Sequence, residues 1–296
     1  MNPAPRTLRL SDGRQLSYAE LGDPEGIPTI YCHGFPGSRL EAGLFEKAAQ
    51  QQRLRVIAPD RNGLGHSDPN PGRRLLDWAS DVKELVDGLQ IQRFFLVGVS
   101  GGGPYALACA NQLGDRIKGF SLVCPLGPIE EPELLQAMRW PARINFRSIR
   151  RMPQIWEFAY HFSIVPLAQR WPQWIYQMML GMAPPPDSQV LRQSEVRSII
   201  TSSLRESVRQ GAGGVLHEME LYTQPWGFSV REIDLPIQLW HGSADETVPI
   251  LHGETLAARL PACETHYVEQ EGHFSLPIKH AGRILERLMA ANGSGN

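Results

Sequence analysis

The chain has 296 residues, of which 42% are hydrophobic and 20% are charged, and its formal net charge is −2 at pH 7. This composition is that of a globular protein with ample apolar material for a core, and it excludes a disordered, collagen-like or coiled-coil chain. Because 29 basic residues are nearly balanced by 31 acidic ones, no excess of positive charge indicates a nucleic-acid partner.

Short strand-like runs alternate with helical periodicity in the first half of the chain. We predict strands at residues 16–21, 29–32, 55–58, 94–99 and 119–124, and helices at residues 38–51, 75–89 and 101–113. The helix at 38–51 is expected to begin at Ser38 as its N-cap, with Glu41 three residues further on at the capping-box spacing. This alternation predicts an α/β fold, with a mostly parallel sheet and helices on both of its faces.

The alternation stops at about residue 127 and resumes after residue 226. Between these points the sequence is helix-like, is broken by prolines and has no convincing strand, and about a hundred residues are too many for a loop. Beyond this segment we predict strands at 237–240 and 264–268 and helices at 250–260 and 280–289. Residues 1–126 and 227–296 are therefore expected to form one core domain, with residues 127–226 inserted as a helical cap. A second domain with an unrelated task is the alternative.

The cysteines and the hydropathy pattern bear on cellular location. Cys32, Cys109, Cys124 and Cys263 form no CxxC pair, which excludes zinc-ribbon and thioredoxin-type sites and favours free buried thiols. Residues 1–14 hold no apolar segment of the kind that a secretory signal needs, and no apolar run approaches the roughly 18 residues that span a membrane. We therefore expect a cytoplasmic protein without a transmembrane segment, either a monomer or a homodimer.

A candidate nucleophile lies in the sequence Gly98-Val99-Ser100-Gly101-Gly102, between a predicted strand and a predicted helix. In a G-x-S-x-G turn the serine projects its hydroxyl from a strained bend, and the glycines two residues before and after it let the chain cross itself closely. The helix that follows aims amide groups and the positive end of its dipole at an oxyanion. A phosphate cradle is the alternative, but neither GxxxxGK[ST] nor GxGxxG is present.

A serine hydroxyl needs a general base, and that base needs an acceptor to orient it. His273 lies in the loop between the last predicted strand and the last helix, over the edge of the sheet where active sites of parallel sheets form. Asp245 follows the strand at 237–240 and is suited to accept the second imidazole proton, with Glu246 as its rival and a helix N-cap as its structural alternative. His241 is interpreted as a packed turn residue.

The turn His33-Gly34-Phe35-Pro36-Gly37 follows the strand at 29–32. We expect the amide of Phe35 to pair with that of Gly101 as an oxyanion hole, since Pro36 has no N–H to donate. His33 is interpreted as a structural brace beneath the turn.

These segments together resemble the α/β-hydrolase fold superfamily, and in particular its capped serine hydrolases. The turn at residues 33–37 resembles the HGxPG element, residues 60–67 resemble the loop D-x-x-G-x-G-x-S, and residues 98–102 resemble the nucleophile elbow. Asp245 and Gly272-His273 resemble the acid and histidine loops, in the chain order Ser, Asp, His of that class. The likeness covers residues 14–126 and 226–289, and it implies an α/β-hydrolase fold with a Ser100–Asp245–His273 triad.

The same resemblance narrows the chemistry. Epoxide hydrolases and haloalkane dehalogenases of the capped group attack with a carboxylate, so a serine at position 100 argues against both activities. Prolyl iminopeptidases usually carry Trp-Gly after the serine, whereas Gly101-Gly102 follows here, which argues against an aminopeptidase. Esterases and meta-cleavage-product hydrolases keep the Ser–Asp–His set.

We therefore expect a carboxylesterase-like serine hydrolase that cleaves a carboxylic ester, with a thioester or a lactone as variants of the substrate. Carbon–carbon bond hydrolysis of the meta-cleavage-product type is the alternative, and a ligand-binding protein without turnover is a third hypothesis. The chemistry of such a triad needs neither a metal nor an organic cofactor.

The predicted cap is rich in aromatic side chains. Four of the seven tryptophans of the chain, Trp140, Trp156, Trp171 and Trp174, lie in it. We expect them to line a pocket for a small-molecule substrate with an apolar or aromatic acyl group, with simple packing against the core as the alternative.

Arginines also cluster in the predicted cap. Arg139, Arg143, Arg147 and Arg150 recur at steps of four, four and three, which places them near one helical face, and Arg151 adjoins them. This stripe is interpreted as a solvated helix face or, functionally, as a surface that attracts an anionic substrate, an acidic partner or a membrane.

Overall fold

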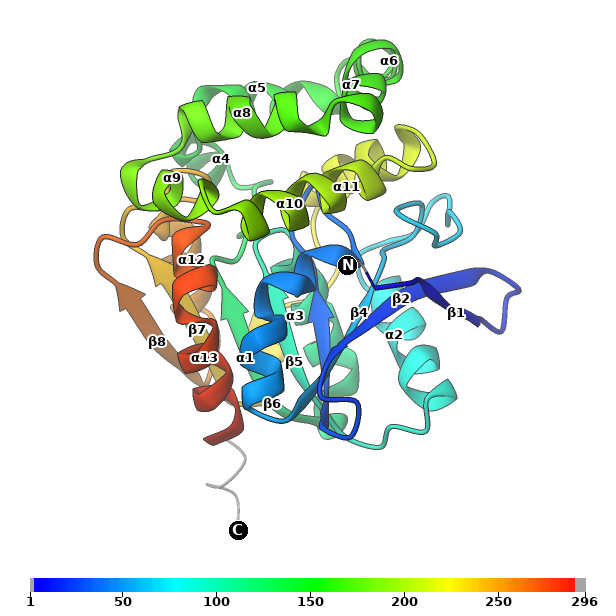
Figure 1. Ribbon diagram of the computed structural model, residues 1–296, viewed down its shortest axis with the longest axis vertical. Coiled ribbons are helices and arrows are strands. Elements are labelled where there is room, and N and C mark those ends of the chain that lie inside the picture. Colours follow the sequence, from blue (N-terminus) through cyan, green and yellow to red (C-terminus); the bar gives the residue numbers. More distant parts are fainter. Residues whose placement is uncertain (1–2, 291–296) are drawn as a thin grey trace.

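The computed structural model describes residues 3–290, and its strands form an eight-stranded sheet (Figure 1). The pairs β1–β2 and β2–β4 are antiparallel, and all other neighbouring pairs are parallel, which confirms the predicted mostly parallel sheet. In spatial order the strands are β1 (Arg6–Arg9), β2 (Gln15–Gly22), β4 (Leu54–Pro59), β3 (Ile27–Cys32), β5 (Phe94–Val99), β6 (Ile117–Val123), β7 (Ile237–Gly242) and β8 (Cys263–Val268).

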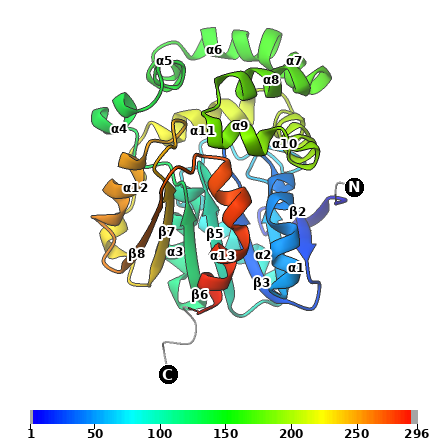
Figure 2. The same ribbon diagram turned by 60° about the vertical axis from the view of Figure 1, so that its left-hand side comes forward.

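Helices cover both faces of this sheet (Figures 1 and 2). One face carries α1 (Glu46–Gln51) and α13 (Ser275–Ala290), and the other carries α2 (Asp77–Gly88), α3 (Gly102–Leu113) and α12 (Ile250–Ala257). Side chains of the central strand β5 alternate between the two cores, with Phe95 and Val97 on the α13 side and Phe94 and Leu96 on the α3 side. Because both faces are buried, this strand reads in the sequence as an unbroken apolar run.

The segment between β6 and β7 is helical and lies above the carboxyl ends of the parallel strands (Figures 1 and 2). A proline occupies the first or second position of six of its helices, where the missing N–H costs no hydrogen bond. Across residues 3–290 no helix is long and apolar enough to cross a membrane. In chain order the segment contains α4 (Pro132–Ala137), α5 (Trp140–Ile149), α6 (Pro153–Ala159), a π-helical turn (Tyr160–Ile164), α7 (Val165–Arg170), α8 (Pro172–Met182), α9 (Pro185–Leu191), α10 (Ser194–Ser207) and α11 (Gly213–Tyr222).

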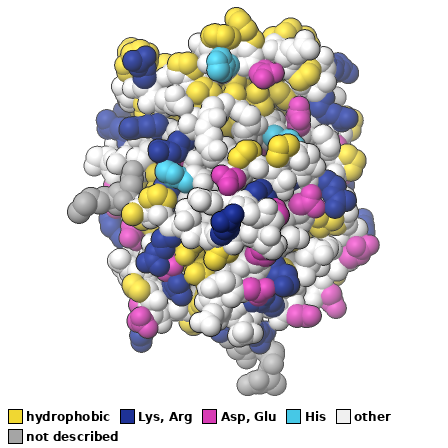
Figure 3. Space-filling view, turned by 90° about the vertical axis from the view of Figure 1, so that its right-hand side faces the viewer, with side chains coloured by type: hydrophobic (Ala, Val, Ile, Leu, Met, Phe, Trp, Pro, Cys, Tyr) yellow, Lys and Arg dark blue, Asp and Glu magenta, His cyan; other side chains and the backbone are white. Residues whose placement is uncertain are grey.

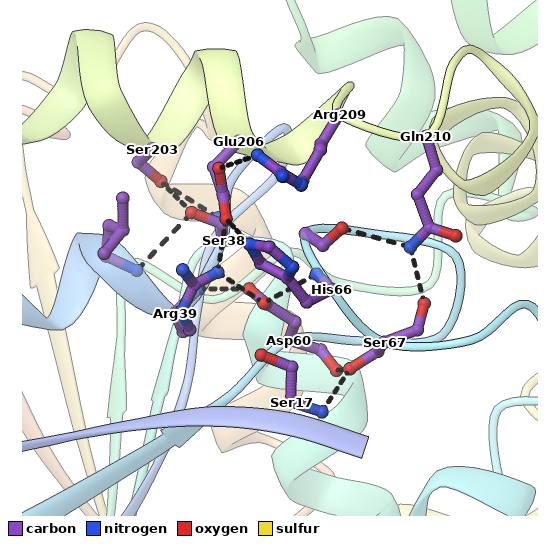
Figure 4. Close-up of polar contacts among 12 residues, drawn as sticks. Ser17, Ser38, Arg39, Asp60, His66, Ser67, Ser203, Glu206, Arg209 and Gln210 are labelled. Atoms are coloured by element: carbon purple, nitrogen blue, oxygen red, sulfur yellow. Dashed lines mark hydrogen bonds and ion pairs between the residues drawn. The ribbon is translucent and has the colours of Figure 1, made fainter. Parts of the chain in front are cut away.

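Buried polar contacts join this segment to the sheet domain along α10, and we call them the α10 seam (Figure 4). The Arg39 guanidinium lies between Asp60, in the loop after β4, and Glu206 of α10, with nitrogen–oxygen distances of 2.7 Å to each carboxylate. The Ser38 amide donates to the Ser203 hydroxyl at 2.9 Å. Arg39 and Asp60 are buried, so these contacts fix α10 against the loops at the top of the sheet.

The predicted boundaries of two helices and the number of strands need correction. Residues 39–45 form a 3₁₀-helix that Ser38 caps, and α1 begins only at Glu46; Glu41 closes no capping box, because its carboxylate turns toward β3 and the turn after it. The last helix begins at Ser275 and not at residue 280. Strand β1 escapes prediction because its residues are largely exposed and show no apolar alternation.

Candidate active site

Ser100 lies on the turn between β5 and α3, at the carboxyl edge of the sheet. Its backbone φ of 53° is in the left-handed region, which is uncommon for a residue with a side chain and is typical of a functionally constrained turn. A Cβ atom on Gly98 would lie 2.5 Å from the Ala106 Cβ, and one on Gly102 would lie 2.1 Å from the Cys32 carbonyl oxygen. The predicted need for glycine at both positions is therefore confirmed.

The structure brings the three predicted catalytic side chains together. The His273 Nε2 lies 3.0 Å from the Ser100 Oγ, and the His273 Nδ1 lies 2.7 Å from the Asp245 Oδ2. The other carboxylate oxygen of Asp245 accepts hydrogen bonds from the amides of Thr247 and Val248 at 2.9 and 2.8 Å. All three side chains are buried, and the carboxylate is fixed on both oxygens. This arrangement can orient an imidazole and deprotonate a hydroxyl.

Charge pairing sets the protonation of this array. Burial alone would raise the pKa of Asp245, but the neighbouring His273 and His241 outweigh it, so this pKa lies well below its usual range. Burial would lower the pKa of His273, yet the Asp245 charge prevails and raises this pKa above its ordinary value of 6.5. Asp245 therefore stays ionised and strengthens the basicity of the imidazole.

The rival residues lie elsewhere. Glu246 is exposed and its carboxylate pairs with Arg139 of the helical segment at 3.3 Å, whereas the hydrogen bond of the His273 ring is accepted by Asp245. His241 is fully buried behind the acid, with its Nε2 2.8 Å from the Val248 carbonyl oxygen and 3.5 Å from Asp245. His241 is thus a packed turn residue, as the sequence indicates.

Three possible metal-ligand atoms, from Cys124, Asp245 and His273, lie within 4.8 Å of one another. Two of them already bond to each other in the Ser–His–Asp array. Burial, followed by the Asp245 charge, raises the pKa of the Cys124 thiol well above its ordinary value. The thiol is thereby held protonated, which makes it a poor ligand.

The backbone of Phe35 lies close to Gly101, the residue that follows Ser100. A Cβ atom built on Gly101 would lie 3.3 Å from the Phe35 amide nitrogen. Within residues 3–290 neither amide donates to a backbone carbonyl, so both remain available to a ligand. The Tyr222 hydroxyl of α11 donates to the Gly101 carbonyl at 2.9 Å and holds this turn from above.

A buried ion pair supports the turn that carries Phe35. The guanidinium of Arg61, in the loop after β4, donates to the carbonyls of His33 and Gly34 and pairs with Glu218 of α11. Burial, and then the Arg61 charge, lowers the pKa of His33 to about 3, so this imidazole is neutral. His33 is fully buried and its Nδ1 lies 2.9 Å from the Gly34 carbonyl oxygen, as expected of a brace.

A cavity of about 400 Å³ opens above Ser100, between the sheet domain and the helical segment. Most of its lining is apolar, and it comes both from the helical segment, including α5, α8 and α10, and from the sheet domain. Glu41 is the feature that sequence reasoning missed: it lines the cavity and accepts hydrogen bonds from the Gly34 amide at 2.7 Å and the Tyr31 hydroxyl at 3.1 Å. Burial raises the pKa of Glu41. The only sequence signal for this role of Glu41 is its position one turn after the His33–Gly37 motif, and the same position also fits a capping box.

The tryptophans of the helical segment do not line the cavity, and this part of the predicted site is wrong. Trp140, Trp171 and Trp174 point to solvent, with 66%, 49% and 63% of their surface exposed, and Trp156 packs beside the core and donates to the Ser148 hydroxyl. On α8 it is Ile175 and Met179 that face the cavity. Because this helix is apolar on both sides, its sequence does not indicate which side turns inward.

Asp187, from α9, also escapes prediction. Its Oδ2 accepts from the His273 amide at 3.0 Å, and its Oδ1 accepts from the amides of Phe274 and Ser275 at 2.9 and 2.8 Å. These amides open helix α13, so a carboxylate from the helical segment caps the helix that carries the histidine loop. The side chain is fully buried, and its three charge-assisted hydrogen bonds fix the backbone of His273, Phe274 and Ser275.

A serine, a histidine and an aspartate joined by hydrogen bonds at the carboxyl edge of a parallel sheet define the class of α/β hydrolytic enzymes. A family model described as alpha/beta hydrolase fold matches residues 28–279, and the chain belongs to that family. This finding confirms the resemblance that the sequence motifs indicate.

Individual relatives are similar at low identity. A 2-hydroxymuconate semialdehyde hydrolase from Pseudomonas putida is 25% identical over 90% of this chain and 88% of its own length. A proline iminopeptidase from Neisseria gonorrhoeae is 29% identical over 39% of this chain and 38% of its own length. A thermophilic esterase from Thermogutta terrifontis superposes with a TM-score of 0.71 at 20% identity, covering 98% of this chain and 99% of that structure, which shows the shared fold.

Proposed function

We propose that the protein is a serine hydrolase that cleaves a carboxylic ester through an acyl-enzyme on Ser100. The supporting observation is the continuous chain of contacts from Ser100 through His273 to Asp245, together with the largely apolar cavity that Ser100 and His273 line. An apolar lining suits the acyl or alcohol part of an ester, and a thioester or lactone would react by the same steps. Residues 127–226 act as the cap of this enzyme.

In the proposed reaction the Ser100 oxygen attacks the ester carbonyl while His273 takes its proton. The amides of Phe35 and Gly101 stabilise the oxyanion, and the imidazolium, held by Asp245, then protonates the leaving alcohol. His273 next activates a water molecule, which attacks the acyl carbonyl and restores the Ser100 hydroxyl. Glu41 accepts a hydrogen bond from the Gly34 amide and so fixes the turn that carries the Phe35 amide.

Reaction with a fluorophosphonate probe and turnover of p-nitrophenyl esters of rising chain length test this proposal. We expect the probe to label Ser100, and Ser100→Ala to abolish labelling and to lower ester turnover by roughly 10⁴-fold or more. Ser203→Ala is the matched control, because Ser203 also lines the cavity but bonds to Ser38. Labelling that survives in Ser100→Ala would show that the nucleophile is assigned wrongly, and a Ser100 that never labels would favour a binding protein without turnover.

Carbon–carbon bond hydrolysis is the second candidate. Similarity to 2-hydroxymuconate semialdehyde hydrolase extends over 90% of the chain, and the same three side chains serve that chemistry. The apolar cavity favours an ester, because the one arginine or lysine in its described lining, Arg139, is already paired with Glu246. Assay of a ring-fission product beside short esters separates the two: faster turnover of the ring-fission product would replace our proposal.

A further inference from the structure

The outer side of α8 presents apolar side chains to solvent. Trp171, Trp174, Met178 and Met182 follow one another at steps of three, four and four residues, so they form a stripe along one helix face, and all four are exposed. A helix of a globular protein normally buries such a stripe and turns its polar face outward. The outer apolar face of α8 is therefore left largely uncovered by the described chain, although a stripe of this kind is normally buried.

Two neighbouring helices repeat this arrangement. Phe158 and Phe162, which continue α6 into the π-helical turn, are 66% and 62% exposed and lie with their ring centroids 4.6 Å apart. Trp140 and Ile144 form the exposed apolar side of α5. Ten of the twelve exposed large hydrophobic side chains in the described part of the chain lie within residues 140–182. They gather over the top of the molecule in Figure 3, above α10 and α11 in Figure 1, and we call them the cap face.

Positive charge accompanies the cap face. Residues 139–182 contain six arginines against one glutamate, a net charge of +5, whereas the whole chain carries −2. All six arginines are exposed, and Arg143 and Arg147 lie on α5 beside Trp140 and Ile144. An apolar surface with tryptophan and phenylalanine, bordered by arginine, has the composition of a segment that lies in the interface of a membrane.

We propose that the cap face docks on the surface of an anionic lipid bilayer, with its aromatic and methionine side chains in the headgroup boundary and its arginines on the lipid phosphates. Anionic headgroups supply the negative charge that the cap face lacks, and the acyl boundary covers its apolar stripes. A second copy of the chain fits less well. In a twofold dimer the same surface meets itself, which would place arginine against arginine.

The cavity opens beside this face. Met182 belongs to the cap face and also lines the cavity. The exposed Arg139 lines the cavity too. It donates to the Met182 carbonyl at 2.6 Å and so joins the start of α5 to the end of α8. A protein docked through α5, α6 and α8 would therefore present the mouth of its cavity to the bilayer. Docking itself requires no catalysis, so its test is independent of the proposed hydrolase activity.

Co-flotation with vesicles tests the proposal. We expect the full-length protein to float with vesicles of phosphatidylcholine and phosphatidylglycerol, and far less with phosphatidylcholine alone or at high salt. Arg143→Gln with Arg147→Gln should weaken partitioning by about 30-fold, since each arginine near an anionic surface contributes roughly fivefold. Phe158→Ser with Phe162→Ser should weaken it by roughly tenfold or more.

Matched controls remove similar groups away from the cap face. Arg9→Gln with Arg53→Gln removes two exposed charges, and Tyr267→Ser removes an exposed aromatic ring on β8; neither should change partitioning. Circular dichroism and thermal melting verify that each variant folds. A wild-type protein that does not float with anionic vesicles, or that floats equally after the phenylalanine substitutions, overturns the proposal. The proposal is also overturned if vesicles do not bind the protein and sedimentation equilibrium shows a dimer that the double variant Phe158→Ser with Phe162→Ser dissociates.

Discussion

Replacing Asp187 by asparagine tests whether the helical segment between β6 and β7 positions the histidine loop. Asparagine has the shape of aspartate, but one of its two terminal atoms is an NH₂ group that accepts no hydrogen bond. Asp187 uses both oxygens, one toward the amide of His273 and the other toward those of Phe274 and Ser275. Whichever way the amide turns, at least one buried backbone N–H of this loop then faces another donor.

The magnitude follows from that lost partner. A buried donor left without an acceptor costs about 1–3 kcal/mol, so the free energy of unfolding should fall by that amount and Tm by roughly 2–5 °C. If the strain displaces His273 from Ser100, the same energy appears in the barrier and kcat falls by roughly 10- to 100-fold. The substitution also removes a negative charge near His273, and this charge is one of those that raise the pKa of the imidazole.

The pH profile separates positioning from a general loss of structure. His273 must be neutral to act as a base, so activity is lost as the pH falls through its pKa. Without the Asp187 charge this pKa is lower, and the acidic limb of kcat/KM should move to lower pH. Hydrolysis of a soluble p-nitrophenyl ester, measured against pH, gives both readouts, with the exposed Asp234→Asn as the control. A Tm that falls while kcat and the acidic limb stay at their wild-type values would refute a positioning role and leave Asp187 as a structural cap alone.

Three further predictions follow from the site and its supports. The kcat/KM of the wild-type enzyme should rise with pH through an inflection above 6.5, because Asp245 raises the pKa of His273. Glu218→Gln should lower the free energy of unfolding in urea by about 3–5 kcal/mol at neutral pH, since it leaves the buried Arg61 charge unpaired. Burial would raise the pKa of Glu218, but the Arg61 charge outweighs burial and lowers this pKa to about 2. The stability that the carboxylate contributes is therefore present above its ordinary pKa of 4.5 and is lost as the pH falls toward 2. The Glu218→Gln variant should not show this loss of stability at acidic pH. Ile175→Trp should reduce turnover of long-chain relative to short-chain soluble esters by roughly tenfold or more, whereas Trp174→Ala should leave the chain-length preference unchanged.

Each of these has a control and a contrary result. An inflection below 6.5 would mean that desolvation, and not the Asp245 charge, governs His273. For Glu218, the control is the exposed Asp87→Asn, which removes the surface ion pairs with Lys83 and Arg116 and should change stability by less than about 1 kcal/mol for each pair. An equal loss in both variants would contradict the role of burial. If the chain-length preference changes in Trp174→Ala and not in Ile175→Trp, the tryptophans line the pocket after all.

Local sequence patterns predict the sheet and the arrangement of the three central side chains because each of these depends on short-range rules. Apolar runs of strand length predict the parallel strands, and glycine spacing predicts the turn at Ser100, since a Cβ at Gly98 or Gly102 would overlap the neighbouring chain. Asp245 and His273 follow from their places after strands β7 and β8, at the edge where parallel strands end.

Other parts of the site depend on contacts that leave no such pattern. Asp187 binds backbone amides 86 to 88 residues away, and backbone groups carry no sequence signal. Glu41 fits a capping box by spacing, yet its carboxylate instead satisfies the buried amide of Gly34. On α8, Trp174 and Ile175 are both apolar neighbours, so hydrophobicity alone does not show that one faces solvent and the other the cavity.

The α10 seam and the Arg61–Glu218 pair constrain how a substrate reaches Ser100. Separating the helical segment from the sheet would break the buried contacts of Arg39 with Glu206 and of Arg61 with Glu218. Lifting the whole segment therefore disrupts both ion pairs. Met179 and Met182 of α8 line the cavity, and rotation of these flexible side chains would widen it while leaving both ion pairs intact.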